Sequence, residues 1–128
     1  MDAATLAACT EARYDRAGLF AIPLTAAMDR FEINTPGRIA CFLATVAIES
    51  ARLSALEEGL SYSSADRLRE IFPSLFVPAK GGNHRAENYV RNPGGLSRLR
   101  YEGFHGRGLI QLTWLENYAA AGAALGFD

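Results

Sequence analysis

One amphipathic stretch constrains the fold more than any other part of this 128-residue sequence. Thr35-Pro36 places a side-chain oxygen before a proline, a common start of an α-helix because proline fits the first helical turn. Beyond it, apolar residues recur at spacings of three, four and seven, typical of a buried helix face: Ile39, Phe42, Val46 and Leu53. The pattern predicts a helix that opens at Pro36 and packs one face into a core.

A carboxylate interrupts this apolar face. Glu49 lies in its one gap, where the side chain is expected to be buried among apolar neighbours and costly to desolvate. Such a residue is either a satisfied buried acid or a catalytic group. A continuous helix would place Glu49 and Glu58 on opposite faces, so we expect a break at Ser54 or Gly59. Glu58 would then lie in a loop and face Glu49 across a cleft.

Start and stop signals predict further helices in the rest of the chain. Ser63 with Asp66 and Thr113 with Glu116 have the spacing of capping boxes, whereas Asn92-Pro93-Gly94-Gly95 predicts a turn. The expected helices run from Asp2 through Cys9, over Ala12–Phe20, from Pro23 to Phe31, from Ser63 to Phe72, over Asn83–Val90, and from Trp114 to Leu125 with Gly126 as the stop.

Few segments alternate apolar and polar residues over the length of a strand. The expected fold class is therefore mainly α, with at most a small β-hairpin near Leu60. Five prolines, 49% apolar residues and this length describe one globular domain over residues 1–128. No apolar run approaches the length of a membrane span, and Thr10, Glu11 and Arg13 interrupt any secretory signal.

Cysteine and charge usage narrow the classes of site. Cys9 and Cys41 lie in alanine-rich helical patterns, so we expect small buried residues and no metal or cofactor site. Net charge is −1, yet residues 80–107 hold six basic residues against two acidic ones. That segment is a solvated loop or a surface for an anionic ligand. Nucleic-acid binding is disfavoured, because no recognised binding motif accompanies it.

Two carboxyl groups in different environments are what a glycoside-cleaving site requires. One donates a proton to the leaving oxygen, and the other works on water or on the sugar. Glu49, on the apolar stripe, fits the proton donor. Glu58, beside Gly59 in a polar loop, fits the base, and Glu57 is interpreted as a solvated neighbour.

Three motifs accompany these carboxylates in order, followed by Glu116-Asn117-Tyr118: Ala47-Ile48-Glu49-Ser50, Glu58-Gly59-Leu60-Ser61-Tyr62-Ser63 and Gly106-Arg107-Gly108-Leu109-Ile110-Gln111-Leu112-Thr113. Together they resemble family 19 glycoside hydrolases, the group of chitinases and of phage or bacterial endolysins that cut peptidoglycan. The resemblance covers nearly the whole chain. It implies a lysozyme-like α-helical domain.

The resemblance also implies catalytic roles. Glu49 matches the general acid and Glu58 the general base of an inverting mechanism. Thr113 matches the hydroxyl that holds the attacking water, although it also has the position of a helix cap. Arg107 is expected either in a structural ion pair with Glu49 or Glu58, or against the anionic wall polymer.

Four further residues are implied in substrate binding. Gln111 and Asn117 match sugar-binding amides, since an amide both donates and accepts hydrogen bonds. Tyr62 and Trp114 are candidates for stacking on sugar faces, with a core or lid role open for Trp114.

The chain departs from the family pattern at three points. Ile48 stands where the family has a histidine, and the segment from Gly94 to Gly106 is shorter than the family's. Family members also continue past the position of Asp128, so the domain is expected to be incomplete at its C-terminus.

The sequence thus predicts a glycosidase of the muramidase or endolysin type that hydrolyses the β-1,4 glycan backbone of the bacterial cell wall. A chitinase acting on GlcNAc polymers and a catalytically impaired remnant that binds glycan or a partner remain open. Expected partners are peptidoglycan or a chitin-like polysaccharide, with a holin, a secretion apparatus or an immunity protein. We expect synthesis in the cytoplasm without a signal peptide and action at the cell wall, in the periplasm.

Overall fold

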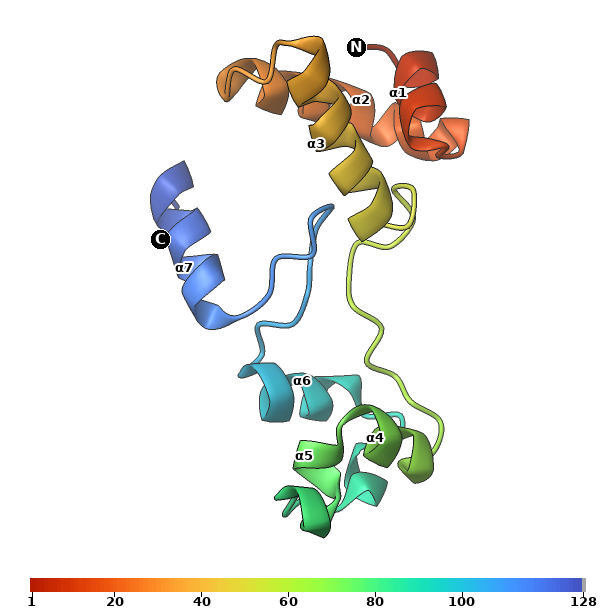
Figure 1. Cartoon of the computed structure of the whole chain (residues 1–128), viewed down its shortest axis with the longest axis vertical. Coiled ribbons are helices and arrows are strands. Elements are labelled where there is room, and N and C mark those ends of the chain that lie inside the picture. The colour runs from red at the N-terminus through yellow and green to blue at the C-terminus, as the bar shows by residue number, and fades with distance from the viewer. Residues whose placement is uncertain (128) are drawn as a thin grey trace. The chain divides into compact units, whose positions relative to one another are not determined.

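A computed structural model describes residues 1–127 and is mainly helical, as the sequence predicts (Figure 1). The described chain divides into two compact units, each with its own apolar core. The first comprises Met1–Glu57 and Arg107–Gln111, and the second comprises Glu58–Gly106 and the chain from Leu112 onward. The sequence pattern, which predicts one domain, gives no sign of this division.

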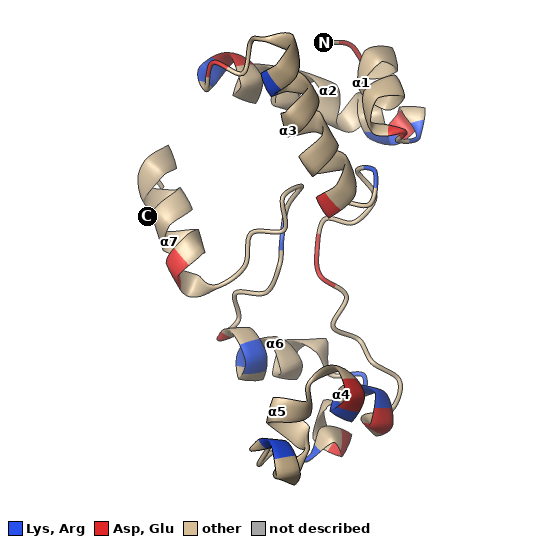
Figure 2. Ribbon diagram, in the orientation of Figure 1, with Lys and Arg blue, Asp and Glu red and all other residues tan. Residues whose placement is uncertain are grey.

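Three helices build the first unit: α1 (Ala3–Thr10), α2 (Tyr14–Arg30) and α3 (Pro36–Glu49). Asp2 caps α1 as predicted, by accepting a hydrogen bond from the backbone N–H of Thr5 at 2.8 Å. Charged residues of these helices lie mostly near the helix ends, which leaves apolar middles to pack together (Figure 2). The resulting core contains Leu6, Ala17, Ala21, Leu24, Leu43, Val46 and Leu53.

Helix α2 is continuous where the sequence predicts two helices. The expected boundary between Phe20 and Pro23 is wrong, because the buried stripe of α2 runs straight across it: Ala17, Ala21, Leu24 and Met28. Pro23 lies on the exposed side, where it removes one backbone donor without breaking the stripe. Packing of that stripe against α1 and the shared core outweighs the cost of the proline.

Helix α3 begins as predicted and ends early. The Thr35 hydroxyl accepts a hydrogen bond from the backbone N–H three residues on, at 3.4 Å, and Pro36 is the first helical residue. The helix ends at Glu49, before the breaks expected at Ser54 or Gly59.

The prediction that Glu49 is buried in the apolar face of α3 is wrong. Glu49 is exposed, and Ser50, one residue later, is the fully buried position. At 3.6 residues per turn, Leu43, Val46 and Ser50 follow one line, whereas Glu49 is rotated to the edge of that face. The three-residue spacing from Val46 therefore pointed to the wrong side of the helix.

A left-handed turn follows α3. Three consecutive non-glycine residues have positive φ: Ala51 (46°), Arg52 (58°) and Leu53 (64°). This region costs about 1–2 kcal/mol per residue, so surrounding contacts must hold it. Leu53 is fully buried, its N–H donates to Ser50 Oγ at 2.9 Å, and its carbonyl accepts from Arg16 Nε at 2.9 Å.

The second unit contains shorter elements: α4 (Ala65–Ile71), α5 (Pro73–Phe76), the 3₁₀ helices η1 (Pro78–Lys80) and η2 (Ala86–Tyr89), α6 (Pro93–Tyr101) and α7 (Leu115–Leu125). Its core contains Leu60, Leu68, Phe76, Ala86, Leu96 and Tyr101. Where the sequence predicts a helix over Asn83–Val90, the structure has the single 3₁₀ turn η2.

Asn92-Pro93-Gly94-Gly95 starts a helix and is not the predicted turn. The Asn92 side chain accepts a hydrogen bond from Gly95 N at 2.9 Å, and Pro93 is the first residue of α6. An asparagine cap followed by proline favours a helix start as strongly as a turn.

Both predicted capping boxes are wrong in detail. Ser64, not Ser63, caps α4 by accepting a hydrogen bond from the backbone N–H of Arg67 at 3.2 Å. At α7 the cap position is Trp114, one residue after the predicted Thr113, with φ of 75° and no side-chain cap bond of its own. The predicted stop at Gly126 is confirmed, with φ of 77°.

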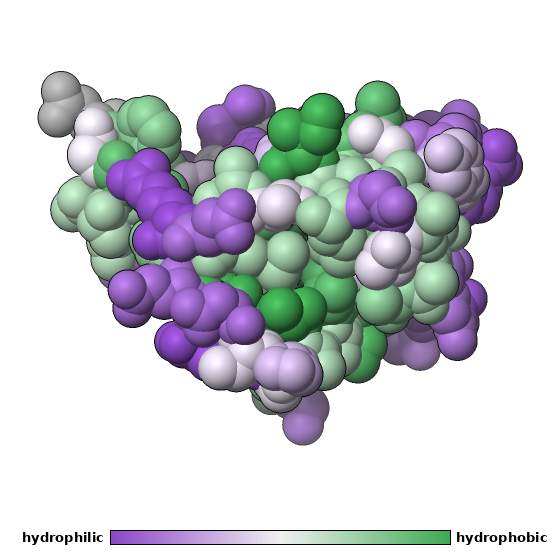
Figure 3. Space-filling model, turned by 90° about the horizontal axis from the view of Figure 1, so that it is seen from above, coloured by the Kyte–Doolittle hydropathy of each residue, from purple (hydrophilic) through white to green (hydrophobic). Residues whose placement is uncertain are grey.

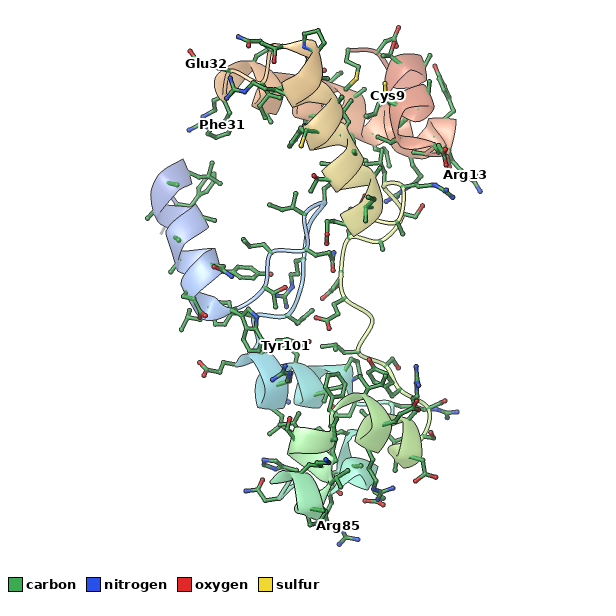
Figure 4. All side chains as sticks on the ribbon, in the orientation of Figure 1. Cys9, Arg13, Phe31, Glu32, Arg85 and Tyr101 are labelled. Carbon is green, nitrogen blue, oxygen red and sulfur yellow. The ribbon has the colours of Figure 1, made fainter. Side chains whose placement is uncertain are left out.

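Within the described residues the chain forms an isolated antiparallel bridge between Glu57 and Arg107, which agrees with the expectation of at most a small hairpin. One expectation about burial fails. Cys9 (Figure 4) and Cys41 are exposed rather than buried. On α1 the buried position one turn after Leu6 is taken by Thr10, whose hydroxyl donates to the Leu6 carbonyl at 2.7 Å.

Apolar and polar side chains share the face of the molecule seen from above (Figure 3). Several large apolar side chains of the first unit are exposed, including Leu19, Ile22 and Ile48. Among the helices of the described residues, none combines the length and apolar character needed to cross a membrane.

Candidate functional site

Glu58 is the carboxylate of the predicted site whose two oxygens both accept hydrogen bonds. It opens the second unit, is half-buried, and its backbone N–H donates to the Gly106 carbonyl at 2.8 Å. The Tyr101 hydroxyl donates to Oε1 at 2.8 Å, and Gly106 N donates to Oε2 at 3.2 Å. Because both oxygens and the backbone are engaged, the carboxylate has a defined orientation.

Tyr101 supplies the shorter of these two side-chain contacts. It is the last residue of α6 and is 9% exposed (Figure 4). The pKa of Tyr101 is raised from 10.0 to about 12. The main cause is burial of the phenol, followed by the hydrogen bond to Glu58 and the negative charge of that carboxylate. The phenol therefore remains a proton-bearing donor at neutral pH.

An aromatic and cationic cluster surrounds Tyr101. Its ring lies 4.9 Å from that of Trp114, centroid to centroid. The guanidinium carbon of Arg100 lies 5.5 Å from the Tyr101 ring and 5.1 Å from the Trp114 ring. Trp114 is thus half-buried beside Tyr101, which agrees with the core role left open for it.

The segment that carries Gly106 is held from two helices. Ser97 Oγ on α6 lies 2.6 Å from His105 Nδ1, and both side chains are buried. From α7, the Tyr118 hydroxyl donates to the His105 carbonyl at 2.9 Å. These contacts fix the backbone immediately before the N–H that reaches Glu58.

Sequence reasoning missed three residues of this arrangement: Tyr101, Ser97 and His105. Tyr101 is 43 residues from Glu58, and no local spacing links them. The one usable signal was that His105 directly precedes the Gly106-Arg107-Gly108 motif.

Glu49, the predicted partner carboxylate, belongs to the first unit. It is the exposed last residue of α3. Next to it, Ile48 is 79% exposed and lines a cavity of about 450 Å³ with residues of α1 and the left-handed turn, among them Thr10, Glu11 and Arg52. Arg52 and Glu11 form an exposed ion pair of 2.7 Å there.

Arg107 and Gln111 also belong to the first unit. Arg107 forms an ion pair with Glu57, where the sequence predicts Glu49 or Glu58 as the partner: Arg107 Nε lies 3.5 Å from Glu57 Oε1. Both side chains are largely exposed, so the pair is worth about 0–1 kcal/mol. Gln111 Nε2 donates to the Gly108 carbonyl at 3.0 Å, within a turn where Gln111 has φ of 51°.

The remaining predicted residues lie in the second unit. Thr113 is half-buried, and its carbonyl accepts a hydrogen bond from Asn117 Nδ2 at 2.8 Å. Tyr62 is half-buried and packs edge-to-face on Phe72, with ring centroids 5.7 Å apart. The structure therefore groups Glu58, Tyr62, Thr113, Trp114 and Asn117 in one unit.

Across the described residues, no three His, Cys, Asp or Glu side chains are grouped so that they could hold a metal ion. Searches of protein-family models and of curated proteins found no match to this chain. What the geometry offers is an oriented carboxylate with a buried phenol and a backbone amide as its donors. Such a group can accept a proton from a water molecule placed beside it.

Proposed function

We propose that this chain is a glycosidase that hydrolyses the β-1,4 glycan backbone of bacterial peptidoglycan with Glu58 as its general base. The observation that carries the proposal is the fixed Glu58 carboxylate, which accepts hydrogen bonds from Tyr101 and Gly106. Holding a base in one orientation removes much of the entropic cost of reaching the transition state.

In the proposed reaction Glu58 removes a proton from water as the water oxygen attacks the anomeric carbon. Glu49 donates its proton to the glycosidic oxygen as the carbon–oxygen bond breaks. The reaction consumes one water molecule and leaves a new reducing end and a new non-reducing end. The configuration at the anomeric carbon is inverted.

The role of Glu49 rests on the order of the sequence motifs and on its accessibility. Glu49 is the exposed last residue of α3, so its carboxyl group is accessible from solvent.

Thr113 is proposed to hold the attacking water through its hydroxyl, and substrate contacts are proposed for Gln111, Asn117, Tyr62 and Trp114. Asn117 is exposed and holds the Thr113 backbone, so it can serve both the loop and a sugar hydroxyl. Peptidoglycan is preferred to chitin because of the Glu-x-Leu-x-Tyr-Ser form of the motif that begins at Glu58. Access to the wall would come through a holin, a secretion apparatus or lysis.

The test is release of reducing ends from purified murein by Glu58→Gln, Glu49→Gln and the matched control Glu57→Gln. We expect each of the first two to lose roughly 10²–10⁴-fold in rate, the range for a general acid or base. Glu57 is exposed and neighbours Glu58, so its variant should retain activity. Full activity in Glu58→Gln would remove that residue from the mechanism.

Three further measurements test the rival functions and the stereochemistry. Chitin oligomers in place of murein distinguish a chitinase, and sedimentation with intact walls detects a protein that binds glycan without cutting it. Proton NMR of the first product formed should show the α-anomer, because inversion converts the β-linkage; a β-anomer would indicate retention.

A further inference from the structure

A polar cavity of about 450 Å³ lies in the second unit, outside the set of residues that hold Glu58. Residues of η2 and α6, with the cap between them, form its wall: Asn88, Tyr89, Asn92, Gly95, Arg98 and Leu99. None of these residues belongs to the motifs that indicate a glycosidase, although Arg98 lies in the basic segment over residues 80–107.

The wall of this cavity is held in place by its own hydrogen bonds. Asn92 Oδ1 accepts from Gly95 N at 2.9 Å, and Asn92 Nδ2 donates to the Asn88 carbonyl at 3.1 Å. A Cβ on Gly95 would lie 2.4 Å from Asn92 Nδ2, so a larger residue at this position would displace the Asn92 amide. The Tyr89 ring packs on Phe76 at 5.4 Å, which fixes the aromatic part of the wall.

Two polar side chains of the wall are available to a ligand. Within residues 1–127, the Asn88 amide and the Arg98 guanidinium are exposed and form no hydrogen bond or ion pair with other side chains. By contrast, Arg67 on α4 is paired with Glu70 at 2.7 Å. Arg98 therefore presents an uncompensated positive charge at the cavity.

We propose that this cavity binds the carboxylate of an acidic glycopeptide. A guanidinium presents paired N–H donors that match the two oxygens of a carboxylate. The Asn88 amide suits an adjoining acetamido or peptide group, and Tyr89 offers an apolar surface. A neutral saccharide would leave Arg98 without an anionic partner.

The inference rests on the proposed function and sharpens its substrate class. Peptidoglycan carries acidic stem peptides on its glycan, whereas chitin has no carboxylate. Arg98 and Tyr101 are three residues apart on α6, about 4.5 Å along the helix axis. A stem peptide anchored at Arg98 would therefore be tied to the same rigid helix that orients Glu58.

The experiment measures ligand affinity by calorimetry on the full chain carrying Glu58→Gln, so that no ligand is cut. The ligands are a muramyl tripeptide, the same tripeptide with its carboxylates amidated, and a GlcNAc trimer. Arg98→Gln should weaken the tripeptide roughly tenfold or more, the range for a hydrogen bond to a charged group. Arg85→Gln is the matched control, because Arg85 (Figure 4) is exposed and is not among the residues that line the cavity.

The proposal predicts that amidation weakens binding by a similar factor and abolishes the effect of Arg98→Gln. Equal affinity for the free and amidated tripeptides, equal losses in the Arg98 and Arg85 variants, or absence of binding would each overturn it. Cleavage does not enter the measurement. Arg98-dependent binding by a chain that never cuts murein would refute the proposed glycosidase and leave the carboxylate site standing.

Discussion

The Tyr101 hydroxyl donates a hydrogen bond of 2.8 Å to Glu58 Oε1, although 43 residues separate the two in the chain. The end of α6 thereby positions a side chain of the extended segment that opens the second unit. With Gly106 N on Oε2, this bond converts a loop carboxylate into an oriented one. The sequence motifs identify the Glu58 carboxylate, and the tertiary structure brings its two hydrogen-bond donors to it.

Tyr101→Phe tests this relationship most directly. It keeps the ring against Trp114 and removes only the hydroxyl. A hydrogen bond to a charged group contributes about 1.5–3 kcal/mol, so we expect murein cleavage to fall roughly 10–100-fold. Tyr14→Phe, at a 68% exposed position of the first unit, is the control and should leave the rate unchanged. Equal rates for both variants would show that the hydroxyl does not orient the base.

The raised pKa of Tyr101 predicts a pH dependence of stability. The pKa is about 12 in the folded protein and 10.0 for the unperturbed group, so the unfolded chain loses this proton first as pH rises. Stability from this group is complete below pH 10 and is lost between about pH 10 and 12. Denaturant midpoints should therefore show the difference between wild type and Tyr101→Phe shrinking across this window. A difference that stays constant would contradict the assignment.

The buried Ser97 and His105 pair is expected to position Gly106. Ser97→Ala leaves His105 Nδ1 without its 2.6 Å partner, which should cost about 1–3 kcal/mol of unfolding free energy. If the pair also orients Glu58 through Gly106, kcat should fall while KM changes little. His105→Asn, which keeps a polar group near Nδ1, should retain more activity than His105→Ala. Ser74→Ala on the exposed face of α5 is the control for a generic serine loss.

Pro23→Ala should stabilise the first unit. Pro23 lies inside α2 and is exposed, so alanine restores a backbone donor without disturbing the buried stripe. Proline in a helix interior costs up to about 3 kcal/mol relative to alanine, and we expect a gain of part of that in thermal or denaturant unfolding. Pro36→Ala, at the first position of α3, restores no helical hydrogen bond and should give no such gain.

Local signals predicted several helix ends correctly. Thr35-Pro36 and Asp2 behave as expected, and Gly126 ends α7. The predictions at Pro23 and at Asn92-Pro93 were wrong. Pro23 lies inside α2, where a new helix was expected, and Pro93 begins α6, where a turn was expected. In both cases the proline has the same local chemistry, and only the packing of the neighbouring residues decides between a break and a helix.

Burial was predicted less well than helicity. The stripe that begins at Ile39 correctly identified Val46 and Leu53 as core residues. It failed for Glu49, because the helix ends there and Ser50 continues the buried line into the left-handed turn. No helical periodicity can describe a turn with three positive φ angles.

By itself, the sequence determined a mainly helical chain, the start of α3, and the two carboxylates on which the proposed chemistry depends. Tertiary structure alone decided that Glu58 is held by Tyr101 and Gly106, that Ser97 and His105 support them, and that Arg107 pairs with Glu57. The physical reason is range. Helix starts depend on contacts within four residues, whereas the orientation of a carboxylate depends on donors that only the folded chain brings within hydrogen-bonding distance.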